Sequence, residues 1–167
     1  MTNIFFTSDT HFGHESILEY CKRPFKTVDE MNEELIKRWN EVVKPEDVVY
    51  HLGDFSFQGK QRTKRKVIMQ QLNGTVILIK GNHDKGADTP IREIIMKHGG
   101  INWKLLHDAK ETNARMNVLC GHVHELWKIK KIGQKLAVNV GVDVWEFRPV
   151  SIQEILNAIE KYKQGEN

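Results

Sequence analysis

The chain has 167 residues, of which 40% are hydrophobic and 28% are charged, and its net charge is +3. These values are ordinary for one soluble globular domain, here residues 1–167, and the charge is too small to require a nucleic-acid partner. The two cysteines, Cys21 and Cys120, are too few for a disulfide framework, so we expect free thiols in a reducing compartment.

The amino-terminal sequence, "MTNIFFTSDTHFGHE", has no basic segment and reaches Asp9 early, which is unlike a secretory signal peptide. The chain also has no run of about 18 consecutive apolar residues, the length expected of a membrane-spanning helix. We therefore expect a cytoplasmic protein with no membrane partner.

Short apolar runs alternate with helical patterns along the chain, which favours an α/β sheet protein over a helical bundle or an all-β sandwich. A helix is predicted over residues 27–43, because Thr27 and Glu30 form a capping-box pattern at its start. Its apolar residues recur along one helical face, at Met31, Leu35, Trp39 and Val42. The predicted strands around this helix are residues 3–8, 47–52 and 75–80.

The second half of the chain continues the same alternation. A helix is predicted over residues 60–72, where an Asn-Gly pair ends it, and another from residue 90 to about residue 98. Residues on either side of Gly133 alternate as in a β-hairpin. A last helix is predicted where Ser151 and Glu154 form a second capping box.

Polar clusters follow the predicted strands, at the edge where open α/β sheets usually bind ligands. The clusters are "SDTH", "LGDF", "KGNHD", "LLHD" and "CGHVH". Asp, Asn and His are poor strand formers, so their concentration there indicates a site that uses them. Imidazoles and carboxylates without a thiolate cluster suit divalent metals such as Zn, Mn, Fe or Co. If the segment is extended, the two histidines of "GHVH" point to opposite faces and could serve two neighbouring metals.

The motifs, taken in order, resemble those of the calcineurin-like metallophosphoesterase family. They are Asp9-Thr10-His11, Gly53-Asp54, Gly81-Asn82-His83-Asp84, His107 and Gly121-His122-Val123-His124. The resemblance implies an α/β fold, a four-layer α/β/β/α sandwich of two mixed sheets with a dinuclear metal site at the carboxyl ends of the strands. One departure concerns "GDFSFQGK", where many members of the family carry a charged residue and this chain has Phe55 and Phe57.

The resemblance also implies two divalent metal ions per chain, which would be Mn, Fe, Zn, Ni or Co. It assigns the first metal to Asp9, His11, Asp54 and His124. It assigns the second metal to Asp54, Asn82, His107 and His122, so that Asp54 bridges the two ions. His107 is preferred because it follows the strand-like segment "WKLL", and His98, near the end of a predicted helix, is the alternative ligand.

The implied reaction is hydrolysis of a phosphodiester or phosphomonoester by in-line attack of a hydroxide that bridges the two metals. His83, beside the metals, is expected to protonate the leaving group, and Asp84 is expected to orient the His83 ring. Asn82 is expected to contact substrate as well as metal. His14 is close enough in sequence to Asp9 to reach the substrate, although it also suits the start of a helix.

The expected partner is a small phosphoester, with a nucleotide as one candidate. A nuclease is the less favoured alternative, because the sequence has no strip of aromatic and basic residues that would stack bases. Its support is a basic stretch that we otherwise interpret as a solvated helix face: Lys60, Arg62, Lys64, Arg65 and Lys66. A non-catalytic scaffold of the same fold is a further alternative, which the presence of His83 and Asp84 argues against. Arg23 and His51 are interpreted as structural, in a turn and a strand respectively.

Overall fold

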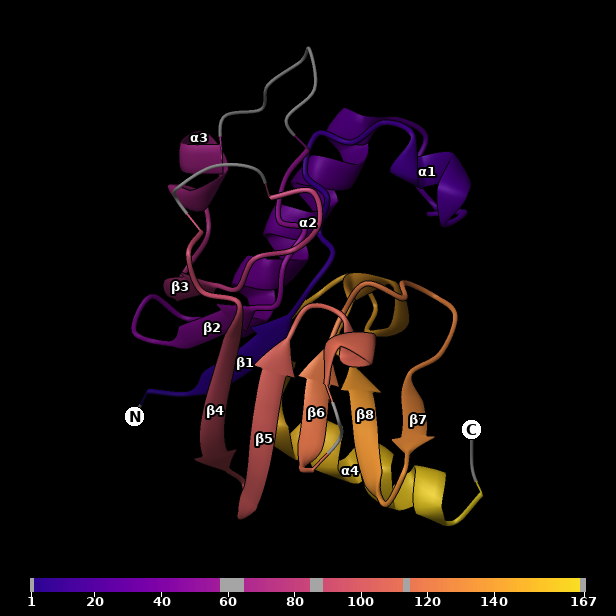
Figure 1. Ribbon diagram of the computed structural model, residues 1–167. Helices are drawn as coiled ribbons and strands as arrows, with labels where there is room; N and C mark the ends of the chain where they lie inside the picture. The colour runs from indigo at the N-terminus through magenta and orange to yellow at the C-terminus, as the bar shows by residue number, and fades with distance from the viewer. Residues whose placement is uncertain (1, 58–64, 85–88, 113–114, 166–167) are drawn as a thin grey trace.

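The computed structural model describes residues 2–57, 65–84, 89–112 and 115–165, which form two β-sheets and four α-helices (Figure 1). The first sheet has the strand order β3-β2-β1-β9 and the second has the order β4-β5-β6-β8-β7. An α/β fold with two mixed sheets agrees with the prediction.

The first sheet contains the three strands predicted in the first half of the chain. Its members are β1 (Ile4–Thr7), β2 (Val48–His51), β3 (Thr75–Leu78) and β9 (Val150–Ser151). The first three strands are parallel, and β9 pairs with β1 in the antiparallel direction. Because parallel strands end at the same edge of a sheet, the segments after β1, β2 and β3 leave the sheet side by side.

The second sheet is built by the later part of the chain. Its members are β4 (Glu93–His98), β5 (Ile101–Leu106), β6 (Asn117–Cys120), β7 (Ile129–Ile132) and β8 (Lys135–Asn139). The strands β5, β6 and β8 are parallel, while β4 and β7 are antiparallel to their neighbours. The pair β7 and β8 is the predicted hairpin around Gly133, which has a φ of 58°.

The predicted helix at residues 90–98 is wrong, because residues 93–98 form β4, which is paired with β5 over its whole length. Its apolar residues suited either a helix or a strand, as short apolar runs often do. The deciding signal is the following pair Gly99 and Gly100, whose φ values are 58° and 76°. Two residues with positive φ make the tight turn that returns the chain as an antiparallel strand.

Three helices pack against the first sheet: α1 (Ile17–Tyr20), α2 (Val28–Val42) and α3 (Arg65–Met69). Of these, α2 confirms the predicted long helix. The predicted apolar face of α2 is buried, because Met31, Leu35 and Trp39 pack in a core cluster with residues of β1 and β2. Thr27 accepts a hydrogen bond from the Glu30 N–H, as expected of the cap. Of the helix predicted over residues 60–72, α3 covers residues 65–69 and ends earlier than predicted, because residues 70–72 form a turn. Residues 58–64 lie outside the described part of the chain.

The last helix, α4 (Ile152–Lys163), packs on the inner face of the second sheet, and Figure 1 shows it behind β5 to β8. Its buried residues Ile155 and Ile159 share a core cluster with Phe6 of β1 and Trp103 of β5. The outer face of the second sheet is covered instead by the 3-10 helix η1 (Ala109–Glu111) and its flanks. Among the described residues that face is covered by η1 and not by an α-helix, and the two mixed sheets are those of the expected fold.

The capping box of α4 gives a small, testable contribution to stability. Ser151 Oγ accepts from the Glu154 N–H at 3.3 Å, and the Glu154 carboxylate accepts from the Ser151 N–H at 2.9 Å. We expect Ser151→Ala to lower the free energy of unfolding by about 1 kcal/mol, measured by urea denaturation. Ser16→Ala is the matched control, because Ser16 precedes α1 without a side-chain capping bond. Equal losses in both variants would contradict the capping account.

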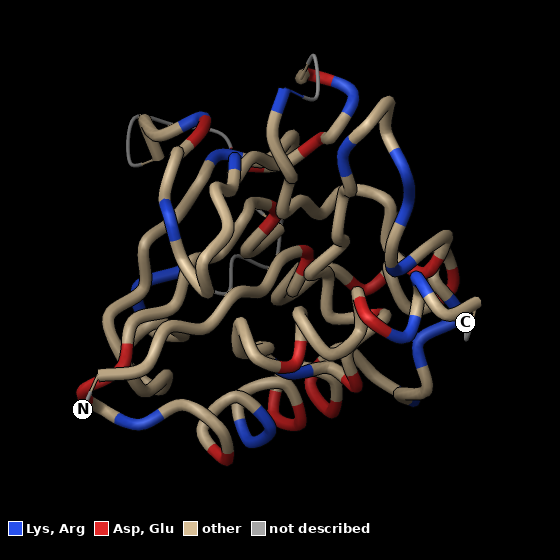
Figure 2. The backbone as a smooth tube through the Cα atoms, turned by 90° about the horizontal axis from the view of Figure 1, so that it is seen from below, with Lys and Arg blue, Asp and Glu red and all other residues tan. Residues whose placement is uncertain are grey.

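Of the basic segment noted in the sequence, only Arg65 and Lys66 lie within the residues that the structure describes. Figure 2 shows basic and acidic residues interspersed along the described chain. Within that segment, Arg65 is not simply solvated, since its guanidinium donates to Asp84 at 2.9 Å and to Thr89 at 2.9 Å. Each helix in the described part of the chain is too short or too polar to cross a lipid bilayer.

Candidate metal centre

The carboxyl ends of five strands from both sheets converge on one group of polar side chains. Asp9 and His11 follow β1, Asp54 follows β2, and His107 follows β5. The segment after β3 carries Asn82 and His83, and the segment after β6 carries His122 and His124. The structure therefore brings together the residues that the sequence motifs singled out.

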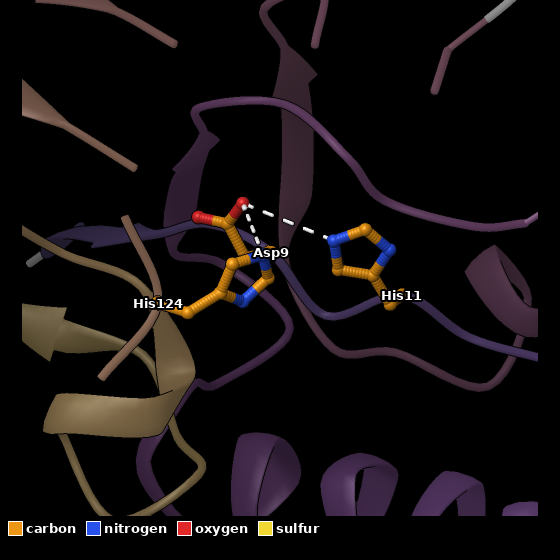
Figure 3. Close-up of side chains that lie close together, drawn as sticks. All are labelled: Asp9, His11 and His124. Atoms are coloured by element: carbon orange, nitrogen blue, oxygen red, sulfur yellow. Dashed lines mark ion pairs between the residues drawn. The ribbon is translucent and has the colours of Figure 1, made fainter. Parts of the chain in front are cut away.

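The first group of candidate metal ligands is Asp9, His11 and His124, shown in Figure 3. One atom from each lies within 4.8 Å of the others. The Nε2 atoms of His11 and His124 are each 4.0 Å from Asp9 Oδ1, so both rings face the same carboxylate oxygen. Asp9 is fully buried, and its oxygens also accept from the backbone N–H of His122. One metal ion fits between these three groups.

The second group is Asp9, Asp54 and His107, whose candidate atoms again lie within 4.8 Å of one another. Asp54 Oδ2 is 3.3 Å from His107 Nε2 and 3.6 Å from His11 Nε2. This carboxylate therefore lies between one histidine of each group, where a ligand shared by two metals would lie. His98, the alternative to His107, lies at the other end of the second sheet, because β4 is antiparallel to β5.

Asn82 and His122 lie at the exposed rim of the second group. The Asn82 amide is 3.3 Å from His122 Nδ1, and the His122 ring centroid is 5.2 Å from that of His107. An amide oxygen and an imidazole placed beside His107 can complete the coordination of a second ion.

Two buried atoms test whether a metal fits this centre. The Nε2 atoms of His11 and His107 are buried and have no hydrogen-bond partner. A buried polar atom without a partner is costly and requires an explanation, such as a bound ion or a functional role. In His107 the Nδ1–H donates to the Leu52 carbonyl at 2.8 Å, so the lone pair of the neutral ring is on Nε2. The donor set and its orientation fit a divalent metal.

The pKa values of the histidines follow from burial and from the neighbouring carboxylates. Burial lowers the pKa of His107, but Asp54 and Asp9 outweigh it and raise that pKa from 6.5 to about 9. His124 behaves alike: burial lowers its pKa, and Asp143 and Cys21 raise it to about 10. A histidine ligand must be neutral, so binding of a metal would displace these protons.

The backbone at the centre is held in a conformation that most residues avoid. Five of the eight described non-glycine residues with positive φ belong to the site, which is where such costly conformations concentrate. They are Asp9 (57°), His11 (50°), Asp54 (55°), His122 (71°) and His124 (47°). Gly81 also permits close packing, because a Cβ atom there would overlap the carboxylate and the amide nitrogen of Asp54.

Arg23 and Asp143 support the first group, and sequence analysis did not identify this role. Asp143, in the 3-10 helix η2 (Val142–Val144), lies 3.1 Å from His124 Nδ1 and thereby turns Nε2 toward Asp9. The Arg23 guanidinium donates to both oxygens of Asp143, at 2.8 and 2.9 Å, and to the Asp9 carbonyl at 2.7 Å. Arg23 is buried, so it ties the loop after β1 to η2.

Asp84 has different partners from those expected. One of its oxygens accepts from the N–H groups of Asp54 and Gly81, at 2.7 and 3.0 Å, and the other accepts from Arg65. The sequence analysis expected Asp84 to orient the His83 ring. The difference has a physical cause, since the turns after β2 and β3 bring two backbone donors into a buried place that requires an acceptor.

His83 and His14 both lie beside the metal ligands. The N–H of His83 donates to Asp54 Oδ1 at 2.8 Å, while its exposed ring lies 5.3 Å from the His11 ring. His14 Nδ1 is 3.2 Å from His11 Nδ1, and the His14 ring stacks on Phe57 with centroids 4.1 Å apart. Phe57, which departs from the family pattern, therefore supports a histidine of the site.

A substitution of Asp143 tests its supporting role. Loss of a carboxylate that orients a metal-binding histidine typically lowers metal affinity by about 10- to 100-fold. We expect Asp143→Asn to weaken binding of one ion by this amount in calorimetric titrations, with the other ion little affected. Glu160→Gln on α4 is the control, since its partner is Lys163 at the surface. Unchanged affinity for both ions in Asp143→Asn would contradict the role.

Comparison with known proteins shows a family and several relatives that the chain resembles. Residues 2–152 match the calcineurin-like phosphoesterase superfamily domain. The chain is 37% identical over 170 residues to an uncharacterized protein of Methanocaldococcus jannaschii, covering 98% of this chain and 94% of the relative. It is 26% identical over 209 residues to the Gene 66 protein of Mycobacterium phage L5, covering 99% of this chain and 98% of the relative.

Among solved structures, a protein of unknown function from Aquifex aeolicus superposes with a TM-score of 0.74 at 26% identity. The superposition covers 95% of this chain and 100% of the other. Each residue of the metal centre described above falls within the matched residues 2–152.

Proposed function

Because this chain belongs to the calcineurin-like phosphoesterase superfamily, we propose that it hydrolyses phosphoesters with the help of two divalent metal ions. The observation that carries the proposal is the position of Asp54, between the unpartnered Nε2 atoms of His11 and His107. Because Asp54 Oδ2 faces two buried and otherwise unsatisfied imidazoles, this carboxylate could serve as a ligand of two cations.

The candidate ligands are divided between the two ions. Asp9, His11, Asp54 and His124 would hold one ion, and Asp54, Asn82, His107 and His122 would hold the other. When bound, such a pair of ions lowers the pKa of a coordinated water and offsets the charge that develops on phosphoryl oxygens.

The protein itself supplies the leaving-group acid in this proposal. The backbone of His83 is fixed to Asp54, and its ring lies beside His11 without being buried. A ring held there can donate a proton to the departing alkoxide of a substrate bound over the ligands. His14, supported by Phe57, lies on the same side and would contact the substrate.

The test is a panel of substrates given to metal-stripped protein with Mn²⁺, Zn²⁺, Co²⁺, Ni²⁺ or Fe²⁺ restored separately. The panel holds aryl phosphomonoesters, aryl phosphodiesters, cyclic nucleotides and single-stranded DNA. We expect turnover of a small mono- or diester that requires added metal. Cleavage of DNA alone would favour a nuclease, and no turnover by any metal-loaded form would favour a non-catalytic scaffold.

A further inference from the structure

A cavity of about 330 Å³ adjoins the candidate metal centre. One wall is formed by α1 and the other by the segment after β6, with histidine rings of the site between them. Its described lining is His11, His14, Ile17, Tyr20, Cys21, His83, His122, Val123, His124, Glu125 and Leu126. A phosphoryl group at the candidate metal ligands would therefore place its ester substituent between two walls that are far apart in the sequence, residues 17–21 and 122–126.

The walls carry the most exposed large hydrophobic side chains of the described chain. Tyr20 is 72% exposed and Leu126 is 74% exposed, and both line this cavity. Ile17 and Val123 line it as well, on the α1 wall and the opposite wall respectively. Exposed apolar side chains that gather at a polar site commonly mark the place where an apolar part of a ligand is covered.

Aromatic rings connect this wall to the metal ligands. The Tyr20 ring meets the His14 ring edge to face, with centroids 6.4 Å apart and planes at 79°. His14 in turn lies 6.0 Å from the His83 ring and 5.3 Å from the His11 ring. Aromatic pairs prefer stacked or edge-to-face arrangements with ring centroids about 4.5 to 7 Å apart. The rings that line the cavity could therefore pack against the ring of a ligand in either way.

The charge of the lining restricts the ligand further. None of the described lining residues is Lys or Arg, and Glu125 is acidic. A second anionic group on the ester substituent would therefore have no Lys or Arg partner among these residues and would meet the carboxylate of Glu125. The lining suits an uncharged substituent.

We infer that this cavity selects phosphoesters whose ester substituent carries an uncharged planar ring, such as an aryl group or the base of a nucleoside, held between Tyr20 and Leu126. The inference rests on the proposed function, because it requires the phosphoryl group to lie at the metal ligands. It goes beyond that proposal by naming the substrate class.

Phosphonates test the inference without any turnover. Phenylphosphonate, cyclohexylphosphonate and methylphosphonate present the same anionic group to metal-loaded protein but differ in the substituent. We expect calorimetric titration to show phenylphosphonate binding about tenfold more tightly than methylphosphonate, as burial of part of a ring predicts. Cyclohexylphosphonate should bind more weakly than phenylphosphonate, because it cannot stack.

Variants assign the preference to the two walls. Tyr20→Ala and Leu126→Ala should each reduce the preference for phenyl over methyl, and the double variant should abolish it, with methylphosphonate affinity unchanged. Both side chains are exposed, so neither change should unfold the protein. Ile95→Ala is the control, since Ile95 is 60% exposed on β4 and does not line the cavity.

Equal binding of the phenyl and methyl compounds, or a preference that survives in the double variant, would overturn the inference. Equal binding of phenyl and cyclohexyl compounds would overturn the planar ring as the selected feature. If the predicted binding pattern holds while no ester in the panel is hydrolysed, the proposed function fails and the cavity assignment stands. If no phosphonate binds the metal-loaded protein, both fail.

Discussion

Alanine at position 54 is expected to remove both metal ions and to lower kcat/KM for a phosphoester by about 10³-fold or more. The reason is geometric, since Asp54 Oδ2 lies 3.3 Å from His107 Nε2 and 3.6 Å from His11 Nε2, and so faces one histidine of each ligand group. Metal ions contribute several kcal/mol of transition-state stabilisation, which corresponds to this loss of rate. The measurements are metal content after dialysis and steady-state kinetics.

Two further variants distinguish the role of Asp54 as a ligand of both ions from other effects of Asp54→Ala. In the wild type, Asp54 Oδ1 accepts a hydrogen bond from the His83 N–H at 2.8 Å, and the side-chain oxygen of Asp54→Asn can accept the same bond. This variant should therefore keep the local backbone conformation and still bind both metals poorly. His124→Ala should lose chiefly one ion, because His124 is a member of the first group and not of the group with Asp54 and His107. Two tightly held ions in Asp54→Ala would show that the bridging assignment is mistaken.

Alanine at position 83 is expected to give the second large effect, with a different signature. His83→Ala should retain both metals and slow hydrolysis of an alkyl ester by about 10²- to 10⁴-fold, the usual contribution of general acid catalysis. The variant keeps the backbone N–H that binds Asp54, so only the ring is lost. With p-nitrophenolate as leaving group the loss should be smaller, because that anion departs without a proton.

Asp84→Asn is the informative companion of His83→Ala. Both oxygens of Asp84 accept hydrogen bonds, one from the N–H groups of Asp54 and Gly81 and the other from Arg65. Replacing one oxygen by an amide NH₂ group should therefore disturb the turns that hold the candidate metal ligands. We expect weaker metal binding and similar losses of rate with alkyl and aryl esters. A loss confined to alkyl esters in Asp84→Asn would instead support the ring-orienting role inferred from sequence. Loss of a metal in His83→Ala would make His83 a ligand.

The convergence of the site could be predicted because parallel strands impose it. Asp9 and Asp54 each follow a buried strand of the first sheet, and His107 follows a strand of the second. Polar residues with low strand propensity at these positions indicated where the chain leaves each sheet. The structure accordingly places Asp9, Asp54 and His107 within reach of one another.

Other parts depended on contacts that no local pattern encodes. Arg23 and Asp143 are 120 positions apart, so their ion pair could not be predicted from either neighbourhood. The carboxylate of Asp84 was assigned to the nearest ring in sequence, whereas buried backbone donors of two turns bind it. The strand β4 was taken for a helix because its apolar spacing suited both, and Gly99 with Gly100 decided between them.

The central claim is that two ions and the catalytic activity belong to the same site. The most direct test adds metal stepwise to stripped protein and measures, in the same samples, the ions bound per chain and the rate of hydrolysis of bis(p-nitrophenyl) phosphate. We expect the rate to rise as the second ion binds and to level off at two ions per chain, and to be lost on chelation. A rate that is already full in the metal-free protein, or that stays at zero with two ions bound, would contradict the account.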